Sequence, residues 1–354
     1  MSRITIAAAG TGKTTSIARS IATSPDRRAL VVTYTVNGTR ELERAVVNER
    51  GFLPSNVTIM TWFSFLMEHL IRPYQLLSGN YRIRKFEFNR PPNFKIKESS
   101  RAYYFTRDLL LYTDKASQFA LKCAINSEMK SFNRLGKIFE DVYVDECQDL
   151  GGWDWNLVES MLVSGLNIHL VGDPRQSTFK TNYSTKNKNL KGVGLMALFE
   201  EWRDRNLCTI ESLTDCYRSN QSICDVSNMV FPKMDKVISK NVTSTGHDGV
   251  FLVRPDDFSA YFQKFSPAIL RHDKRANCFG LEHVAINWGL SKGLSYDRVA
   301  IIPTKTVEKH LQIGFDKLES PYSFYVALTR ARYSVAIITD SEETHPGVVK
   351  YKPD

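Results

Sequence analysis

The chain has 354 residues, of which 42% are hydrophobic, and a formal net charge of +9. This length allows about two domains with buried cores, and the basic excess favours a polyanionic partner without identifying one. No apolar run approaches the roughly 18 residues of a membrane span, so we exclude a membrane-spanning protein. The six cysteines form no Cys-x-x-Cys pair and no metal-spaced cluster with the seven histidines, which favours reduced thiols over zinc or disulfides.

The first part of the chain alternates short apolar strands with helical stretches. Strands are predicted at residues 3–9, 29–35, 56–62, 138–146 and 166–173, and helices at 13–23 and 38–50. This alternation is typical of an α/β domain with a mostly parallel sheet. The last two strands end in acidic residues, where a buried parallel strand delivers side chains to a site at its carboxyl end.

The same alternation restarts after about residue 205. Strands are predicted there at residues 208–213, 248–254, 275–281, 297–303 and 335–340. We therefore predict two α/β domains, at 1–205 and 206–354. The stretch from about 66 to 120 is rich in aromatic and basic residues and is predicted to be a small basic insertion in the first domain.

A glycine-containing loop joins the first predicted strand to the first predicted helix. Its sequence, AAAGTGKT, fits the phosphate-binding pattern except that Ala7 stands where the first glycine usually is. Backbone N–H groups of such a loop wrap phosphates, while Lys13 would reach the β- and γ-phosphates and Thr14 would hold Mg²⁺. The predicted nucleotide-binding residues here are Ala7, Ala8, Ala9, Gly10, Thr11, Gly12, Lys13, Thr14 and Thr15. A cleaved signal peptide would remove this loop, so we expect none.

The acidic segment DECQD follows the predicted strand at 138–146. Asp145 could hold the metal, and Glu146 is placed to orient and deprotonate an attacking water. An acidic pair alone is as often a solvated loop, but here it stands beside Gln148 and Asp149 and downstream of a phosphate loop.

Further segments, taken with these two, resemble the motifs of the UvrD/Rep/PcrA group of superfamily 1 helicases, and they occur in that group's order. They are TYTVNGTRELERA (33–45), TWFSF (61–65), LVGDPRQSTF (170–179), LTDCYRSN (213–220), LSKGLSYDRV (290–299) and FYVALTRAR (324–332). The resemblance implies two RecA-like P-loop domains with parallel sheets and an ATP hydrolase that uses ATP and Mg²⁺. It also implies contact with single-stranded or partly duplex DNA.

The resemblance implies roles for individual residues. Gln176, Arg218 and Arg330 would act on the γ-phosphate with Glu146 as the base, Arg330 serving as an arginine finger and Tyr217 stacking on adenine. The residues expected to contact DNA are Thr35, Asn37, Thr61, Trp62, Phe179 and Lys292.

Several positions depart from the group's pattern. No glutamine precedes the phosphate loop to read adenine, Ser295 replaces a glutamate, and Phe63 replaces a histidine. The base-stacking tryptophan aligns with Thr181. Only about 70 residues separate LTDCYRSN from LSKGLSYDRV, too few for a large second insertion, so we expect a minimal motor that unwinds long duplexes poorly.

The stretch 81–97, YRIRKFEFNRPPNFKIK, alternates aromatic and basic residues. It could bind a single strand, with cations on phosphates and rings on bases. It could equally be a half-buried strand pair whose aromatics belong to the core.

The sequence therefore predicts an ATP-dependent single-stranded DNA translocase or helicase, moving 3′ to 5′, in repair, recombination or defence. The alternative is a nucleotide-gated, DNA-sensing ATPase subunit with little unwinding of its own. Either would be cytoplasmic, in a bacterial or phage setting, and the expected protein partner is a nuclease or another defence or repair protein.

Overall fold

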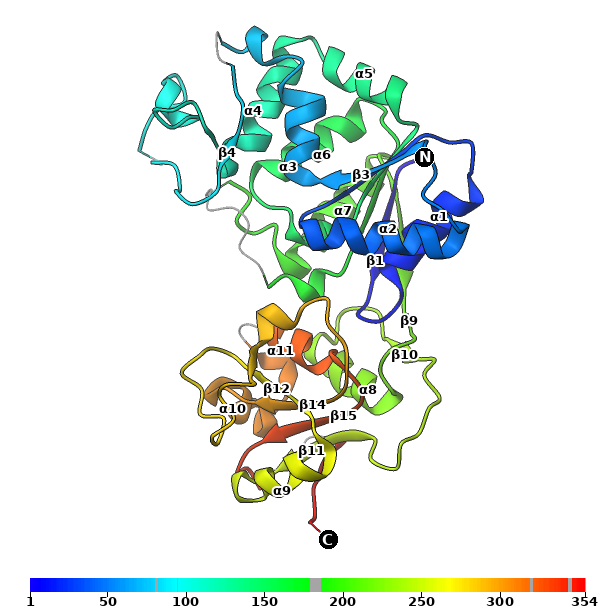
Figure 1. Ribbon diagram of the computed structural model, residues 1–354, viewed down its shortest axis with the longest axis vertical. Coiled ribbons are helices and arrows are strands. Elements are labelled where there is room, and N and C mark those ends of the chain that lie inside the picture. The colour runs from blue at the N-terminus through cyan, green and yellow to red at the C-terminus, as the bar shows by residue number, and fades with distance from the viewer. Residues whose placement is uncertain (80–81, 94, 179–185, 319–320, 343–345, 354) are drawn as a thin grey trace. The chain divides into compact units, whose positions relative to one another are not determined.

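The computed structural model describes residues 1–79, 82–93, 95–178, 186–318, 321–342 and 346–353 (Figure 1). The chain divides into two compact units, each of which forms an α/β structure. Unit 1 comprises Met1–Ile6, Lys13–Pro174 and Phe179–Glu211, and unit 2 comprises Ala7–Gly12, Arg175–Thr178 and Ser212–Asp354. Two short loops from the first half of the sequence therefore group with unit 2.

Unit 1 is built on a six-stranded sheet with the order β3-β2-β6-β7-β1-β8. The strands are β1 (Arg3–Ala7), β2 (Ala29–Thr33), β3 (Val57–Thr61), β6 (Asp141–Val144), β7 (Ile168–Gly172) and β8 (Thr209–Leu213). β2 pairs in parallel with β3 and β6, and β7 pairs in parallel with β6 and β1. Every residue of β2 and β6 is buried, as in strands covered on both faces. The predicted α/β class is confirmed.

The first two helices follow β1 and β2 directly. α1 (Lys13–Thr23) has the predicted bounds, and α2 (Val36–Arg50) begins two residues earlier than predicted. The hydroxyl of Thr35 accepts a hydrogen bond from the Gly38 N–H at 3.0 Å and so caps α2, which ends at Gly51 with a φ of 82°. The buried face of α1 consists of Ile17, Ala18 and Ile21.

The chain between β3 and β6 is more elaborate than a simple crossover. It contains α3 (Trp62–Phe65), the π-helical turn η1 (Leu66–Ile71), η2 (Gln75–Leu77), β4 (Phe86–Glu87), η3 (Arg101–Tyr103), β5 (Leu111–Tyr112), α4 (Thr113–Asn126) and α5 (Lys130–Ile138). β4 and β5 pair in parallel. The predicted insertion at 66–120 ends inside α4, where Phe119 and Ala120 are buried, so its last residues belong to the core of unit 1. Farther along the chain are η4 (Cys147–Asp149), α6 (Trp153–Val163), η6 (Gly192–Gly194) and α7 (Leu195–Asp204).

Unit 2 has its own six-stranded sheet, with the order β13-β12-β14-β15-β11-β16. Its strands are β11 (Gly249–Val253), β12 (Ala268–Arg271), β13 (Ile286–Asn287), β14 (Tyr296–Ile302), β15 (Ala331–Ile338) and β16 (Val348–Lys350). All neighbouring strands pair in parallel. Two parallel sheets of this kind agree with the predicted pair of RecA-like domains.

One predicted strand in unit 2 is wrong. Residues 275–281 form turns, and the strand of this region is β12, which precedes them. Phe279 and Gly280 have φ values of 56° and 84°, which an extended strand does not allow. The segment resembles a strand in the sequence because it contains Cys278, which is buried although the segment is a turn.

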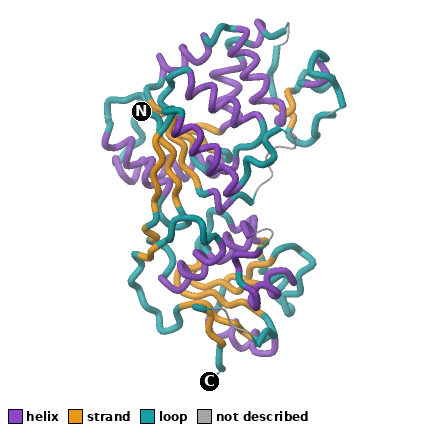
Figure 2. Tube along the Cα trace, turned by 180° about the vertical axis from the view of Figure 1, so that it is seen from behind, coloured by secondary structure: helices purple, strands orange, loops and turns teal. Residues whose placement is uncertain are grey.

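The helices of unit 2 lie alongside its strands (Figure 2). They are α8 (Gln221–Val230), α9 (Pro255–Phe265), α10 (Lys305–Ile313) and α11 (Pro321–Leu328). The side chain of Asn220 caps α8 by accepting from the Ile223 N–H at 3.1 Å. A short parallel pair, β9 (Asp215–Cys216) and β10 (Ile238–Ser239), leads into and away from this helix.

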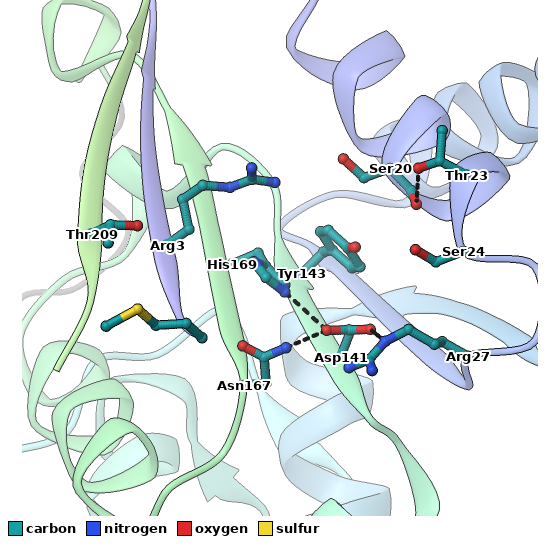
Figure 3. Close-up of a pocket in the computed structure, with 11 residues that line it drawn as sticks. Arg3, Ser20, Thr23, Ser24, Arg27, Asp141, Tyr143, Asn167, His169 and Thr209 are labelled. Carbon is teal, nitrogen blue, oxygen red and sulfur yellow. Dashed lines mark hydrogen bonds and ion pairs between the residues drawn. The ribbon is translucent and has the colours of Figure 1, made fainter.

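A polar cluster joins the amino ends of β6 and β7 to the chain after α1 (Figure 3). The Asp141 carboxylate accepts hydrogen bonds from Arg27 Nε at 2.5 Å, from His169 Nε2 at 3.0 Å and from the Asn167 amide. Burial alone would raise the pKa of Asp141, but the hydrogen bonds from Arg27 and His169 outweigh it and lower that pKa. Burial lowers the pKa of His169. This carboxylate therefore ties three segments of unit 1 together.

Replacing Asp141 with Ala should lower the free energy of unfolding by about 3 kcal/mol, because the half-buried Asn167 and His169 and the exposed Arg27 all lose their acceptor. The difference in the free energy of unfolding should be full above about pH 5 and should shrink as the pH falls through the lowered pKa of Asp141, because acid then protonates the folded state as well. Urea denaturation at several pH values measures both effects. Asp26→Ala, on the exposed loop beside the cluster, is the control, and an equal loss in both variants would contradict this assignment.

Candidate active site

The phosphate loop runs from the end of β1 to the start of α1. Gly10 and Gly12 have φ values of 79° and 80°, a region that glycine enters without a steric penalty. Thr11 closes the turn, since its hydroxyl donates to the Ala8 carbonyl at 2.8 Å. The first N–H groups of α1 follow immediately, at Lys13 and Thr14, and such groups favour an anion.

The loop packs closely against the segment 216–218 of unit 2. A Cβ on Gly10 would lie 2.7 Å from Cys216 Sγ and 2.8 Å from Arg218 Cβ, so no side chain fits there. The Tyr217 N–H donates to the Gly10 carbonyl at 2.9 Å. The Tyr217 ring is 66% exposed, which leaves a face free for stacking on a base. The Ala9 N–H in turn donates to the Tyr325 hydroxyl at 3.4 Å.

The acidic pair follows β6 in unit 1. Asp145 is buried, and Glu146 has a φ of 52°, an uncommon conformation for a residue other than glycine. Strained backbone of this kind clusters at functional sites. Lys13 Nζ lies 4.0 Å from Glu146 Oε1, so the lysine of the phosphate loop and the acidic segment meet.

Gln148 holds the acidic segment against the end of β7. Its Nε2 donates to Glu146 Oε2, and its Oε1 accepts from the Asp173 N–H at 2.9 Å. A Cβ on Gly172 would lie 2.4 Å from Gln148 Oε1 and 2.7 Å from Cys147 Sγ. The packing of Gln148 against Gly172 could not be predicted from the sequence, because a close approach between two strand ends leaves no local sequence pattern.

Negative charge is concentrated around Glu146. Partial burial and the charge of Glu146 raise the pKa of Glu41, which lies on α2. Burial raises the pKa of the Cys147 thiol, and Glu146 and Asp145 raise it further, so this thiol stays neutral. The cysteine of DECQD, Cys147, is buried and packs against the end of β7.

The donor set suits Mg²⁺ bound together with a nucleotide. Thr14 and Asp145 offer hard oxygen ligands, which this ion prefers. Within the described residues, no group of three or more His, Cys, Asp or Glu side chains could hold a metal ion. Such an ion would therefore take most of its ligands from phosphate oxygens and water, as Mg²⁺ commonly does.

Unit 2 brings together the residues expected to act on the γ-phosphate. Arg330 is 2% exposed, and its guanidinium donates to the carbonyls of Val326 and Leu294 at 3.1 and 3.2 Å and to Gln176 Oε1 at 3.3 Å. Arg218 Nη1 donates to the carbonyl of Thr329, the residue before Arg330, at 3.1 Å. The three side chains therefore share one neighbourhood.

The residues expected to contact DNA have different surroundings. Thr35 and Asn37 are exposed at the start of α2, and half-buried Thr61 caps α3 by accepting from the Ser64 N–H at 3.2 Å. Trp62 is only 1% exposed and its indole donates to Asp154 Oδ1 at 3.2 Å, so its ring offers no face to a base. Lys292 is half-buried in unit 2. Phe179 and Thr181 lie outside the described residues.

Two family models match the chain over half its length or more. A model described as an AAA domain matches residues 2–182, and one described as the viral superfamily 1 RNA helicase core domain matches residues 106–339. One subunit of the ATP-dependent helicase/nuclease of Oenococcus oeni is 26% identical over 132 residues, which are 36% of this chain and 10% of that protein.

Solved structures share the fold. The helicase nonstructural protein 10 of an arterivirus has a TM-score of 0.50 at 13% identity, covering 97% of this chain and 60% of that one. A complex of an arterivirus nonstructural protein 10 with DNA has the same TM-score at 12% identity, covering 97% of this chain and 61% of that one. The chain thus spans about three-fifths of these proteins. No helix in the described part of the chain is long and apolar enough to cross a membrane.

Replacing Gly172 with Ala should slow nucleotide hydrolysis by at least about tenfold, because small displacements of catalytic groups carry costs of this size. The new methyl group would push Gln148 and Cys147 away from β7, while Gly10, Gly12 and Lys13 of the phosphate loop are not among the atoms it meets. Separate measurements of turnover rate and nucleotide affinity test whether the rate falls while the affinity is retained.

Gly136→Ala is the matched control, because a Cβ there meets only the end of the Leu166 side chain, at 3.0 Å. A wild-type rate in a folded Gly172→Ala protein would show that this packing does not position Glu146.

Proposed function

This chain belongs to the superfamily 1 helicases, a class of ATP hydrolases, and from that premise we propose that it is a single-stranded DNA translocase or helicase of the UvrD type. The observation that carries the proposal is the meeting of Lys13 with the strained, hydrogen-bonded Glu146 at the end of β6. The ordered motifs and the match to a helicase/nuclease subunit support the UvrD-type assignment. The proposed 3′ to 5′ movement rests on the resemblance of the motifs alone. The two proposed domains are 1–205, which binds ATP, and 206–354.

In the proposed reaction, Glu146 takes a proton from the water that attacks the γ-phosphate, and Gln148 keeps its carboxylate in place. Lys13 and the loop N–H groups hold the phosphates. Mg²⁺, held through Thr14 and Asp145, would neutralise charge on the phosphate oxygens.

Arg330, Arg218 and Gln176 are proposed to stabilise the charge that develops on the γ-phosphate. The acceptors that now hold Arg330 include neutral backbone carbonyls, which a phosphate can outcompete, because a charge-assisted hydrogen bond is roughly twice as strong as a neutral one. Tyr217 would stack on the base from its place beside Gly10.

The second candidate is a nucleotide-gated sensing subunit that unwinds little and acts with a nuclease, repair or defence partner. The observation favouring it is the match to one subunit of a helicase/nuclease, of which the chain covers only 10%. The description of the second family model also makes RNA a ligand to be tested.

Single-stranded DNA should raise the rate of ATP hydrolysis several-fold, because ligands that select one conformation favour each other's binding. Steady-state ATPase assays with single-stranded DNA, single-stranded RNA, duplex DNA and no nucleic acid test this. A rate indifferent to all of them would refute the motor, and a stronger response to RNA would move the proposal to the RNA-dependent class.

Glu146→Gln should retain ATP binding and lose roughly 10²- to 10⁴-fold in turnover, as expected for a general base. Lys13→Ala should weaken nucleotide binding as well, because the lysine contacts phosphates in the ground state. Nucleotide titration and single-turnover hydrolysis separate the two effects. Glu128→Gln, at an exposed position, is the control, and equal affinity losses in the first two variants would refute these roles.

A further inference from the structure

Four aromatic rings gather in unit 1. Phe63, on α3, is at their centre, and its ring centroid lies 5.5 Å from that of Tyr34, 5.3 Å from that of Phe86 and 5.2 Å from that of Phe88. The Phe86 and Phe88 centroids are 6.2 Å apart. Two alternatives were predicted for the stretch 81–97, and the half-buried one applies to Phe86, which packs on the body of unit 1.

Phe88 differs from the other three rings because it is 64% exposed. Phe63 meets it nearly edge-on, at an interplanar angle of 80°, and Phe86 meets it at 77°. These contacts restrict the rotamers of Phe88 while leaving a large part of its ring in solvent. A ring ordered in advance loses less entropy when a planar ligand stacks on it.

The cluster lies at the edge of the sheet where strands β2 and β3 end. Tyr34 directly follows β2, and Phe63 is two residues beyond the last residue of β3. The proposed DNA contacts Thr35 and Thr61 come from the same strand ends. The aromatic cluster is therefore continuous in sequence and in space with the polar residues proposed to contact a nucleic-acid strand.

Basic residues flank the exposed ring in the sequence. The side chains of Arg82, Arg84, Lys85 and Arg90 are all exposed within nine residues of chain. The one carboxylate in this stretch, that of Glu87, accepts a hydrogen bond from the Asn89 N–H at 2.8 Å. Exposed cations on the same short segment as an exposed ring suit a ligand that carries both phosphates and bases, and base stacking on such rings is tolerant of sequence.

We propose that Phe88, supported by Phe63 and Phe86, is a base-stacking platform for single-stranded nucleic acid, flanked by phosphate contacts from Arg84, Lys85 and Arg90. The choice of ligand rests on the proposed function, but the site is a separate one in the insertion. It would give the chain a stacking surface that does not depend on the position aligned with Thr181.

The test is equilibrium binding of a fluorescein-labelled oligothymidylate to the nucleotide-free protein at several salt concentrations. Phe88→Ala should weaken binding about tenfold, because stacking on one aromatic ring contributes that much per base. The Phe88→Ala change should leave the salt dependence of binding unchanged. Arg84→Ala and Arg90→Ala should each reduce the slope of log affinity against log salt concentration by about one. Phe52→Ala is the control, since Phe52 is 57% exposed in unit 1 beside Arg50 but lies outside the cluster.

Phe88→Trp provides a second readout that does not depend on a loss of function. It should bind as tightly as wild type, and the added indole fluorescence should be quenched when the oligonucleotide binds. Wild-type affinity in Phe88→Ala, or an unquenched indole at position 88, would overturn the platform while leaving the proposed function intact. A wild-type protein that binds no oligonucleotide would overturn both.

Discussion

Parallel pairing brings the carboxyl ends of β1, β2, β3, β6 and β7 to one edge of the unit 1 sheet, and the chemistry of this unit depends on that constraint. β1 leads into the phosphate loop, while β6 leads to Glu146. β2 and β3 lead to Thr35, Thr61 and the aromatic cluster. The strand order places the proposed nucleotide residues and the proposed nucleic-acid residues on different flanks of the same edge, so one rigid sheet can support both.

Local backbone geometry then sets the individual side chains. Glu146 adopts a left-handed conformation that Gln148 stabilises by bonding to its carboxylate and to the Asp173 N–H, and this arrangement needs the bare backbone of Gly172. In unit 2, Gly10 also permits a close approach, because the absence of a side chain lets segment 216–218 lie against the phosphate loop. Both glycines act through close approach, so a change in either should affect chemistry more than folding.

Much of this was predictable where function and periodicity impose a local pattern. The bounds of α1 follow from a strand, a glycine loop and a helical repeat, and the acidic end of β6 could be read from DECQD. Features that depend on distant neighbours could not be read. β12 was misplaced because the buried Cys278 gives a turn the composition of a strand, and Trp62 looked like a ligand contact although Asp154, 92 residues away, holds it in the core. The resemblance implied one γ-phosphate for Gln176 and Arg330, but the direct hydrogen bond between these residues, 154 positions apart, has no local sign in the sequence.

We propose above all that the nucleotide state and the binding of a single strand are coupled. The most direct test is the affinity of the Glu146→Gln protein for oligothymidylate, measured without nucleotide, with ATP and with ADP. A variant that binds ATP without hydrolysing it isolates the binding step. We predict dissociation constants that differ several-fold between the ATP and ADP states. Because coupling between two ligands is reciprocal, the factor between the nucleotide-free and ATP states should also appear when ATP affinity is measured without and with oligonucleotide. Identical dissociation constants in all three states would contradict it.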